Sequence, residues 1–269
     1  MDNGTSTLPA EGAWRGATRH ALRSHWPEYL MEAWGLGMFM ISAGLFATLL
    51  EYPGSPVHAA LADGGVRRLL MAAAMGLTAT ALIYSPWGRQ SGAHFNPAVT
   101  LTYLFLGKVA RVDAAAYIAA QFAGGVCGVL AVQFVLGEAF TAPPVHYVAT
   151  LPGSRGAVAA FVAEAAISFG LMLAVLSLSS SARLARLTGV FAALLVATYI
   201  TFEAPVSGMS MNPARSFASA APAGLWQQLW IYFLAPPLGM LAAAFAFVRV
   251  RSLAAVHCAK LDHAPDRRC

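Results

Sequence analysis

One pattern of eleven residues occurs twice in this chain, as SGAHFNPAVTL at residues 91–101 and as SGMSMNPARSF at residues 207–217. Both copies contain Asn-Pro-Ala. Asn is favoured at the N-cap of a helix, and Pro is favoured at the first helical position, where its missing N–H has no helical partner. Each copy therefore predicts a loop that leads into a short helix, with Asn96 and Asn212 as the N-caps.

The two copies would offer a small polar solute both donors and acceptors of hydrogen bonds. The donors are the side-chain amides of the two Asn residues, and backbone carbonyls are the acceptors. Two helix N-termini, each equivalent to roughly half a positive charge, would repel cations but not neutral solutes. The predicted pore motifs are Asn96, Pro97, Ala98, Asn212, Pro213 and Ala214. The predicted acceptor carbonyls are those of Gly92, Ala93, His94, Phe95, Gly208, Met209, Ser210 and Met211.

The composition indicates that these motifs lie in a membrane. Apolar residues make up 58% of the chain and charged residues only 11%, so a soluble domain would expose too much apolar surface. Stretches long enough to cross a bilayer as helices can be counted along the sequence. We predict six, at residues 29–50, 68–86, 112–136, 157–178, 187–204 and 226–248. The predicted fold class is an all-α membrane protein.

Each copy of the motif lies between two predicted spans, and the apolar run after it is too short to cross. A loop at membrane depth is tolerated only where it is buried in protein or lines a cavity. Three spans in each half invert the second half relative to the first, so the loops enter from opposite faces and meet near the midplane. We expect a channel domain at residues 28–250, with inverted halves at 28–137 and 155–250 and tails at 1–27 and 251–269.

The positive charges predict the orientation. All but four of the 17 Lys and Arg residues lie on the side that carries both termini, so the positive-inside rule puts both termini in the cytoplasm. The exceptions are Arg67, Arg68, Arg155 and Arg215. This distribution explains the net charge without a nucleic-acid partner. The bias toward Arg and Ala suggests a bacterial inner membrane.

These features resemble the aquaporin and glycerol-facilitator family, also called major intrinsic proteins. The resemblance rests on two SGxxxNPA motifs among six spans, on Arg215 directly after the second, and on YIAAQ at residues 117–121. It implies six transmembrane helices, two re-entrant half-helices and a homotetramer with one pore per subunit. It also implies passive transport, with no enzymatic activity, cofactor or metal. Glu32 and Glu164 resemble structural acceptors for the loop N–H groups; their alternative role is to carry protons.

The predicted selectivity filter departs from the family's water channels, which combine Phe, His, a small residue and Arg. Here the matching positions are Met75 or Gly76, Ile200, Met209 and Arg215. The filter should be apolar on most sides, and flexible Met side chains set its width. By contrast, Ser216 after the second motif and Tyr232-Phe233 in the last span resemble water channels.

Three functions agree with the sequence to different degrees. The first is a channel for water that also admits small neutral solutes such as glycerol. The second is a facilitator mainly for glycerol, urea or a neutral metalloid acid. The third is an ion-coupled secondary transporter, which would need titratable groups where the two loops meet.

Two residues have more than one interpretation. His94 either lines or gates the inner vestibule, or packs beneath the first loop. Glu203 either pairs with Arg215 or another outer charge, or is a solvated carboxylate of the outer vestibule.

Overall fold

The computed structural model describes residue 19 and residues 21–261. Six of its helices are long and apolar enough to cross a membrane, which confirms the predicted all-α membrane fold. Five of them are α2 (Trp26–Glu51), α4 (Gly64–Tyr84), α7 (Arg111–Leu136), α9 (Gly156–Ser179) and α13 (Leu229–Arg251). The remaining span, Ala185–Phe202, consists of a 3-10 turn followed by α10 (Thr188–Phe202). The second span ends at Tyr84, two residues earlier than predicted, because Ser85 and Pro86 begin a new short helix. Most of the predicted N-terminal tail, and residues 262–269, lie outside the described residues.

Short helices connect the spans. The α-helical ones are α3 (Pro56–Ala60), α5 (Pro86–Ser91), α6 (Pro97–Phe105), α8 (Glu138–Thr141), α11 (Ala204–Ser207) and α12 (Pro213–Ala223). Three are 3-10 helices, η1 (His146–Val148), η2 (Ala185–Leu187) and η3 (Leu253–Ala255). The half-helices α6 and α12 begin at the Pro of each repeated motif, as the sequence predicts.

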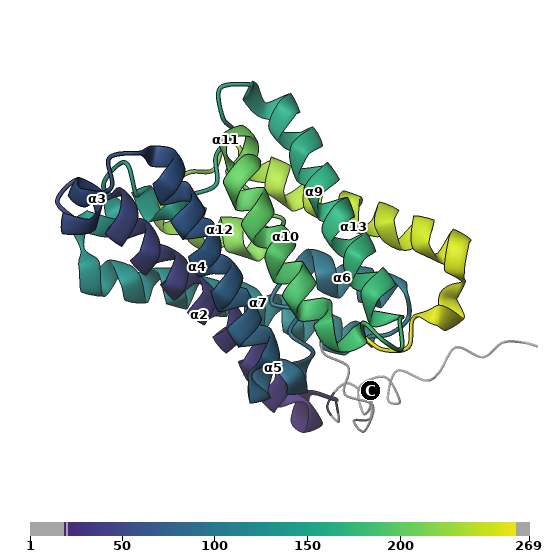
Figure 1. Ribbon diagram of the computed structural model, residues 1–269. Coiled ribbons are helices and arrows are strands. Elements are labelled where there is room, and N and C mark those ends of the chain that lie inside the picture. Colours follow the sequence, from purple (N-terminus) through teal and green to yellow (C-terminus); the bar gives the residue numbers. More distant parts are fainter. Residues whose placement is uncertain (1–18, 20, 262–269) are drawn as a thin grey trace, which may run out of the picture.

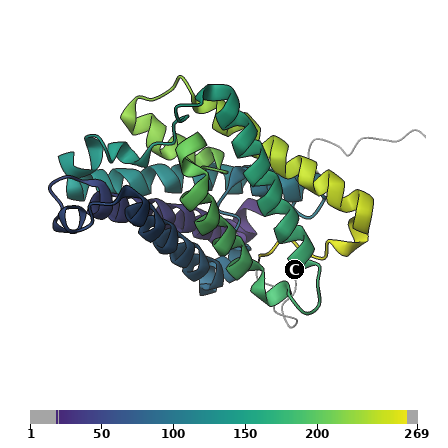
Figure 2. The same ribbon diagram turned by 45° about the horizontal axis from the view of Figure 1, so that its top comes forward.

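The two halves of the chain use the same packing scheme. α2 packs on α7 in the first half, and α9 packs on α13 in the second, while α4 and α10 pair across the halves. Each half-helix also contacts the opposite half, α6 against α13 and α12 against α7. Figures 1 and 2 show α2, α4 and α7 together on one side of the molecule and α9, α10 and α13 on the other. This arrangement is the inverted repeat that the sequence predicts.

Small residues allow the paired spans to approach closely. A Cβ atom built on Gly124 of α7 would lie 2.0 Å from the carbonyl oxygen of Ala33 in α2. A Cβ on Gly239 of α13 would lie 2.2 Å from the carbonyl oxygen of Ala165 in α9. Such close contact between backbones is the usual reason for small residues between membrane helices. Because Ala33 and Ala165 directly follow Glu32 and Glu164, the two contacts fix the backbone at the two buried acids.

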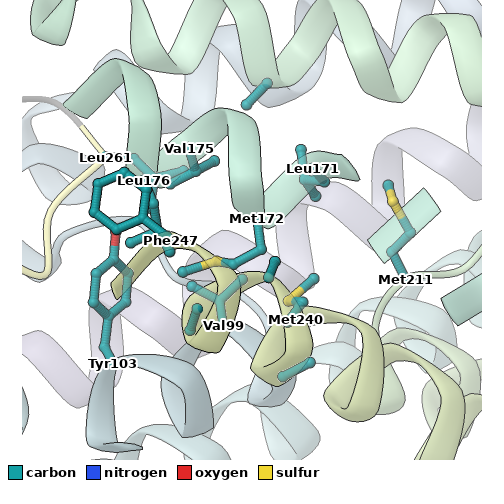
Figure 3. Close-up of a cluster of buried hydrophobic side chains, with 14 of the residues drawn as sticks. Val99, Tyr103, Leu171, Met172, Val175, Leu176, Met211, Met240, Phe247 and Leu261 are labelled. Atoms are coloured by element: carbon teal, nitrogen blue, oxygen red, sulfur yellow. The ribbon is translucent and has the colours of Figure 1, made fainter. Parts of the chain in front are cut away.

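Most of the largest buried apolar cluster lies around α6, α9, α10 and α13. Figure 3 shows Met172 and Leu176 of α9, Met240 and Phe247 of α13 and Tyr103 of α6 within it. Large apolar side chains also cover the outside of the molecule, including Leu77 and Phe134, which are 71% and 90% exposed. Apolar residues on both the inner and the outer surfaces are expected of helices that face lipid.

Candidate pore

The first re-entrant loop is held by the carboxylate of Glu32. Its Oε1 accepts hydrogen bonds from the Ser91 hydroxyl (2.7 Å) and the His94 backbone N–H (3.1 Å). Its Oε2 accepts from the Phe95 backbone N–H (2.6 Å) and from the Gln121 side-chain amide (2.8 Å). Glu32 is fully buried, so these four donors supply the hydrogen bonds that a buried carboxylate needs.

Glu164 holds the second loop in the same way. Its Oε1 accepts from the Ser207 hydroxyl (2.8 Å) and the Ser210 backbone N–H (2.6 Å), and its Oε2 accepts from the Met211 backbone N–H (2.7 Å). Glu164 is also fully buried. The contacts of both acids therefore match the structural role expected from the resemblance, in which they accept hydrogen bonds from the loops.

The two loops share an unusual backbone conformation. Gly92 and Gly208 have φ angles of 97° and 82°, a region that glycine adopts without a steric penalty. Two further non-glycine residues in each loop also have positive φ, namely Ala93, Phe95, Met209 and Met211. Such conformations persist only when the surroundings enforce them. The bonds to the two glutamates supply this enforcement.

The two N-cap asparagines also bind across the repeat. Asn96 accepts from the Ala98 backbone N–H (2.8 Å), and its amide donates to the carbonyl oxygen of Met211 (2.7 Å). The Asn212 amide donates to the carbonyl oxygen of Phe95 (2.8 Å). An amide NH₂ group has two hydrogens, so each Asn keeps one more hydrogen that it can donate. The loops thus meet tip to tip, as predicted from the inverted halves.

A cavity of about 630 Å³ passes these tips. Its walls include residues of both loops, of α2, α4, α9 and α10, and of the segment before η1. Glu51 and Arg67, which form an ion pair with a 3.1 Å N–O distance, also line the cavity. Leu261, near the end of the described chain, also contributes to the wall.

The structure distinguishes between the two alternatives for the filter residue of α4. Met75 lines the cavity, as do Ile200, Met209 and Arg215. Gly76 is absent from the cavity wall, and a Cβ on it would meet the Ala193 carbonyl oxygen and the Ala197 Cβ, both at 3.2 Å. Gly76 therefore packs against α10, and Met75 is the one of the two alternatives that reaches the cavity.

Arg215 is positioned by its own half-helix and by η1. Its guanidinium donates a hydrogen bond to the carbonyl oxygen of Val148 (2.8 Å). No ion pair joins it to Glu203 among the residues that the structure describes. Nor does an ion pair join Glu203 to another charge in the described part of the chain, so its first interpretation is wrong. The second, a solvated carboxylate, is also wrong, because both carboxylate oxygens of Glu203 are buried.

Most of the predicted acceptor residues line the cavity, but Gly92 does not. Its carbonyl oxygen accepts a hydrogen bond from the backbone N–H of Leu261 (3.1 Å) and is directed to the C-terminal segment. The prediction of a pore-lining role for the Gly92 carbonyl is therefore wrong. No pattern in the sequence predicts a hydrogen-bond partner for Gly92 so far along the chain.

His94 combines both of its interpretations. Its ring is buried between Tyr103, stacked at 5.1 Å between centroids, and Tyr117, edge-on at 5.4 Å. It also borders the cavity. Its Nε2 lies 2.7 Å from the carbonyl oxygen of Ala259, and because a carbonyl only accepts, Nε2 carries a hydrogen.

The comparison with protein families agrees with this geometry. Residues 21–247 match the family model described as Major intrinsic protein. The chain belongs to the major intrinsic protein family. The resemblance inferred from the repeated motif is therefore confirmed, and the chain is a multi-pass membrane protein.

Several plant members of the major intrinsic protein family are similar in sequence. The putative aquaporin NIP4-1 of Arabidopsis thaliana is 34% identical over 177 residues, which cover 65% of this chain and 60% of that protein. Aquaporin NIP2-3 of Zea mays is 33% identical over 198 residues, covering 73% and 64%. The chain thus spans less than two thirds of the length of these relatives. Because they are plant proteins, they do not support a bacterial inner membrane.

A solved structure shares the fold. The X-ray structure of the aquaglyceroporin from Plasmodium falciparum superimposes with a TM-score of 0.68 and 18% sequence identity. The match covers 86% of this chain and 99% of that one. The match to the family model and the structural superposition therefore agree on the fold of this chain.

Sequence reasoning missed one part of the cavity wall, the inner face of the first span in each half. Phe39 of α2 and Leu171 of α9 both line the cavity. Each lies seven residues after the buried glutamate of its own helix, and positions i and i+7 share a helix face. The spacing from Glu32 and Glu164 could therefore have identified both residues. Phe39 gives the pore an aromatic wall that the filter positions lack.

Proposed function

We propose that the protein is a passive channel for water that also admits small neutral solutes such as glycerol. The observation that carries this proposal is the meeting of two capped half-helices on one cavity, where the Asn96 and Asn212 amides can each donate to a passing solute. The carbonyl groups of the loops supply acceptors beside these donors. A neutral molecule can thus exchange its hydrogen bonds with water for hydrogen bonds with the wall.

The same arrangement would exclude cations. Both half-helices direct their N-terminal, positive ends to the meeting point, and Arg215 adds a full charge on the side of the second loop. Relatives named as aquaporins support a channel of this kind. We further propose the orientation with both termini in the cytoplasm, a homotetramer with one pore per subunit, and no nucleic-acid partner.

A facilitator mainly for a neutral solute is the second candidate. It is favoured by the residues at the filter, because Met75, Ile200 and Met209 add apolar surface to the cavity wall that Arg215 also lines. Such a filter gives a polar solute few hydrogen-bond donors other than the arginine, and its apolar side chains can contact the less polar parts of a solute larger than water. An ion-coupled transporter is disfavoured, because neither Glu32 nor Glu164 lies on the cavity wall and both bind the loops instead.

Stopped-flow light scattering of proteoliposomes distinguishes these proposals. In a sucrose gradient the vesicles should shrink faster than empty ones, because water leaves through the pore. After shrinking in a hyperosmotic glycerol gradient, they should also re-swell faster than empty vesicles, because glycerol enters through the pore and water follows. Rapid glycerol entry with water loss no faster than in empty vesicles would contradict the water channel and support the solute facilitator. Folding of the reconstituted protein is checked by circular dichroism.

A further inference from the structure

The chain does not leave the molecule where α13 ends. After Arg251 it forms η3 and then turns back over the first re-entrant loop. We call residues 253–261 the C-terminal strap. Val256, Cys258 and Leu261 of the strap are only 2%, 5% and 7% exposed. A segment with these side chains buried is part of the fold, although the sequence predicts a tail here.

Two hydrogen bonds join the strap to the first loop. The Leu261 backbone N–H donates to the Gly92 carbonyl oxygen (3.1 Å), and the His94 Nε2–H donates to the Ala259 carbonyl oxygen (2.7 Å). The contact is close, because a Cβ on Gly92 would lie 2.9 Å from the Ala259 carbonyl oxygen. The strap therefore binds the residues that lead directly to the tip of the first loop.

The last residue of the strap also forms part of the cavity wall. Leu261 lines the cavity and belongs to the same apolar cluster as Tyr103, Leu176 and Phe247. Figure 3 shows Leu261 beside these residues at one end of the cluster, with Met211 of the second loop at the other end. The side chain of Leu261 is therefore placed at the mouth on the side of the first loop, away from the Arg215 filter.

We propose that the C-terminal strap forms a second constriction of the pore, with Leu261 as the residue that narrows this mouth. The proposal rests on the channel function proposed above. One backbone hydrogen bond and one from the His94 side chain join the strap to the first loop, and the strap forms no regular helix beyond η3. A terminal segment with so few hydrogen bonds to the rest of the fold opens locally at low cost. Undocking withdraws Leu261 and widens the mouth. The wider mouth therefore increases the rate of entry of a larger solute, such as glycerol, more than the rate of entry of water.

Two variants of the full-length chain test the strap. Leu261→Pro removes the N–H that donates to Gly92, and the loss of one net hydrogen bond raises the undocked fraction about fivefold. Leu261→Ala keeps the N–H and shortens the side chain at the mouth. His257→Ala is the matched control, because His257 lies within the strap but is exposed. Hydrogen exchange of peptides covering residues 253–261 measures docking separately from transport.

The expected result is faster glycerol entry in both Leu261 variants, with a smaller gain for water. The strap of Leu261→Pro should also exchange faster, while His257→Ala behaves as the wild type in both assays. Faster exchange in Leu261→Pro with unchanged glycerol entry in both Leu261 variants would overturn the proposal. That result differs from failure of the channel function itself, in which the wild type would carry neither water nor glycerol.

Discussion

Replacing Glu164 with alanine should lower the free energy of unfolding by about 3 kcal/mol or more, because each buried donor left without a partner costs about 1–3 kcal/mol. Three donors lose their acceptor, namely the Ser207 hydroxyl and the Ser210 and Met211 backbone N–H groups. The loop that they hold contains residues at positive φ, so it should rearrange and water transport should be lost. Thermal unfolding in detergent, followed by circular dichroism, measures the first effect, and light scattering of proteoliposomes measures the second.

Two control variants separate this role from others. Glu138→Ala removes an exposed glutamate and should change the free energy of unfolding by no more than about 0.5 kcal/mol. Glu164→Gln keeps one acceptor oxygen and should be intermediate in stability while retaining some water transport. If Glu164→Ala unfolds at the wild-type temperature, the structural role of this acid is wrong.

Combining Met75→Phe with Ile200→His should reduce glycerol entry at least about tenfold, equivalent to about 1.4 kcal/mol in the barrier. Both residues line the cavity on neighbouring helices, α4 and α10, so the two added rings together reduce its width. The imidazole restores a polar group, which water can use despite the smaller opening. Water transport should therefore fall less than glycerol transport. Light scattering in glycerol and sucrose gradients measures both rates on the same vesicles.

Leu77→Phe is the matched control for this filter variant. It adds an aromatic ring to the same helix, but Leu77 is 71% exposed on the outer surface and does not line the cavity. Its transport rates should equal those of the wild type. A larger loss of water than of glycerol in the double variant would contradict this placement of the filter.

Much of the fold was readable from the sequence because local chemistry determines it. The N-caps at Asn96 and Asn212 follow from the residue types alone, and the structure places a half-helix after each. The family resemblance implied the structural roles of Glu32 and Glu164, and their equivalent positions in the two halves agree with it. These features depend on residues close in sequence or on symmetry.

Features that depend on tertiary contacts could not be predicted from the sequence. The spans are apolar on nearly all sides, so their composition does not say which face meets the cavity; Phe39 was missed and Gly76 could not be separated from Met75. The C-terminal strap was missed for a different reason. Its segment has no helical or strand periodicity, and the hydrogen bond from Leu261 to Gly92 joins residues far apart in the chain. Only the folded arrangement of α13 brings them together.

The central claim is that two half-helix N-termini and Arg215 form a pore that passes neutral molecules and excludes cations. Its most direct test is to measure water and proton flux on the same proteoliposomes, the first by light scattering and the second with a pH-sensitive dye trapped inside. We predict water flux that rises with the amount of protein per vesicle, and proton flux that stays at the level of empty vesicles. A proton flux that increases in step with the water flux would contradict the claim.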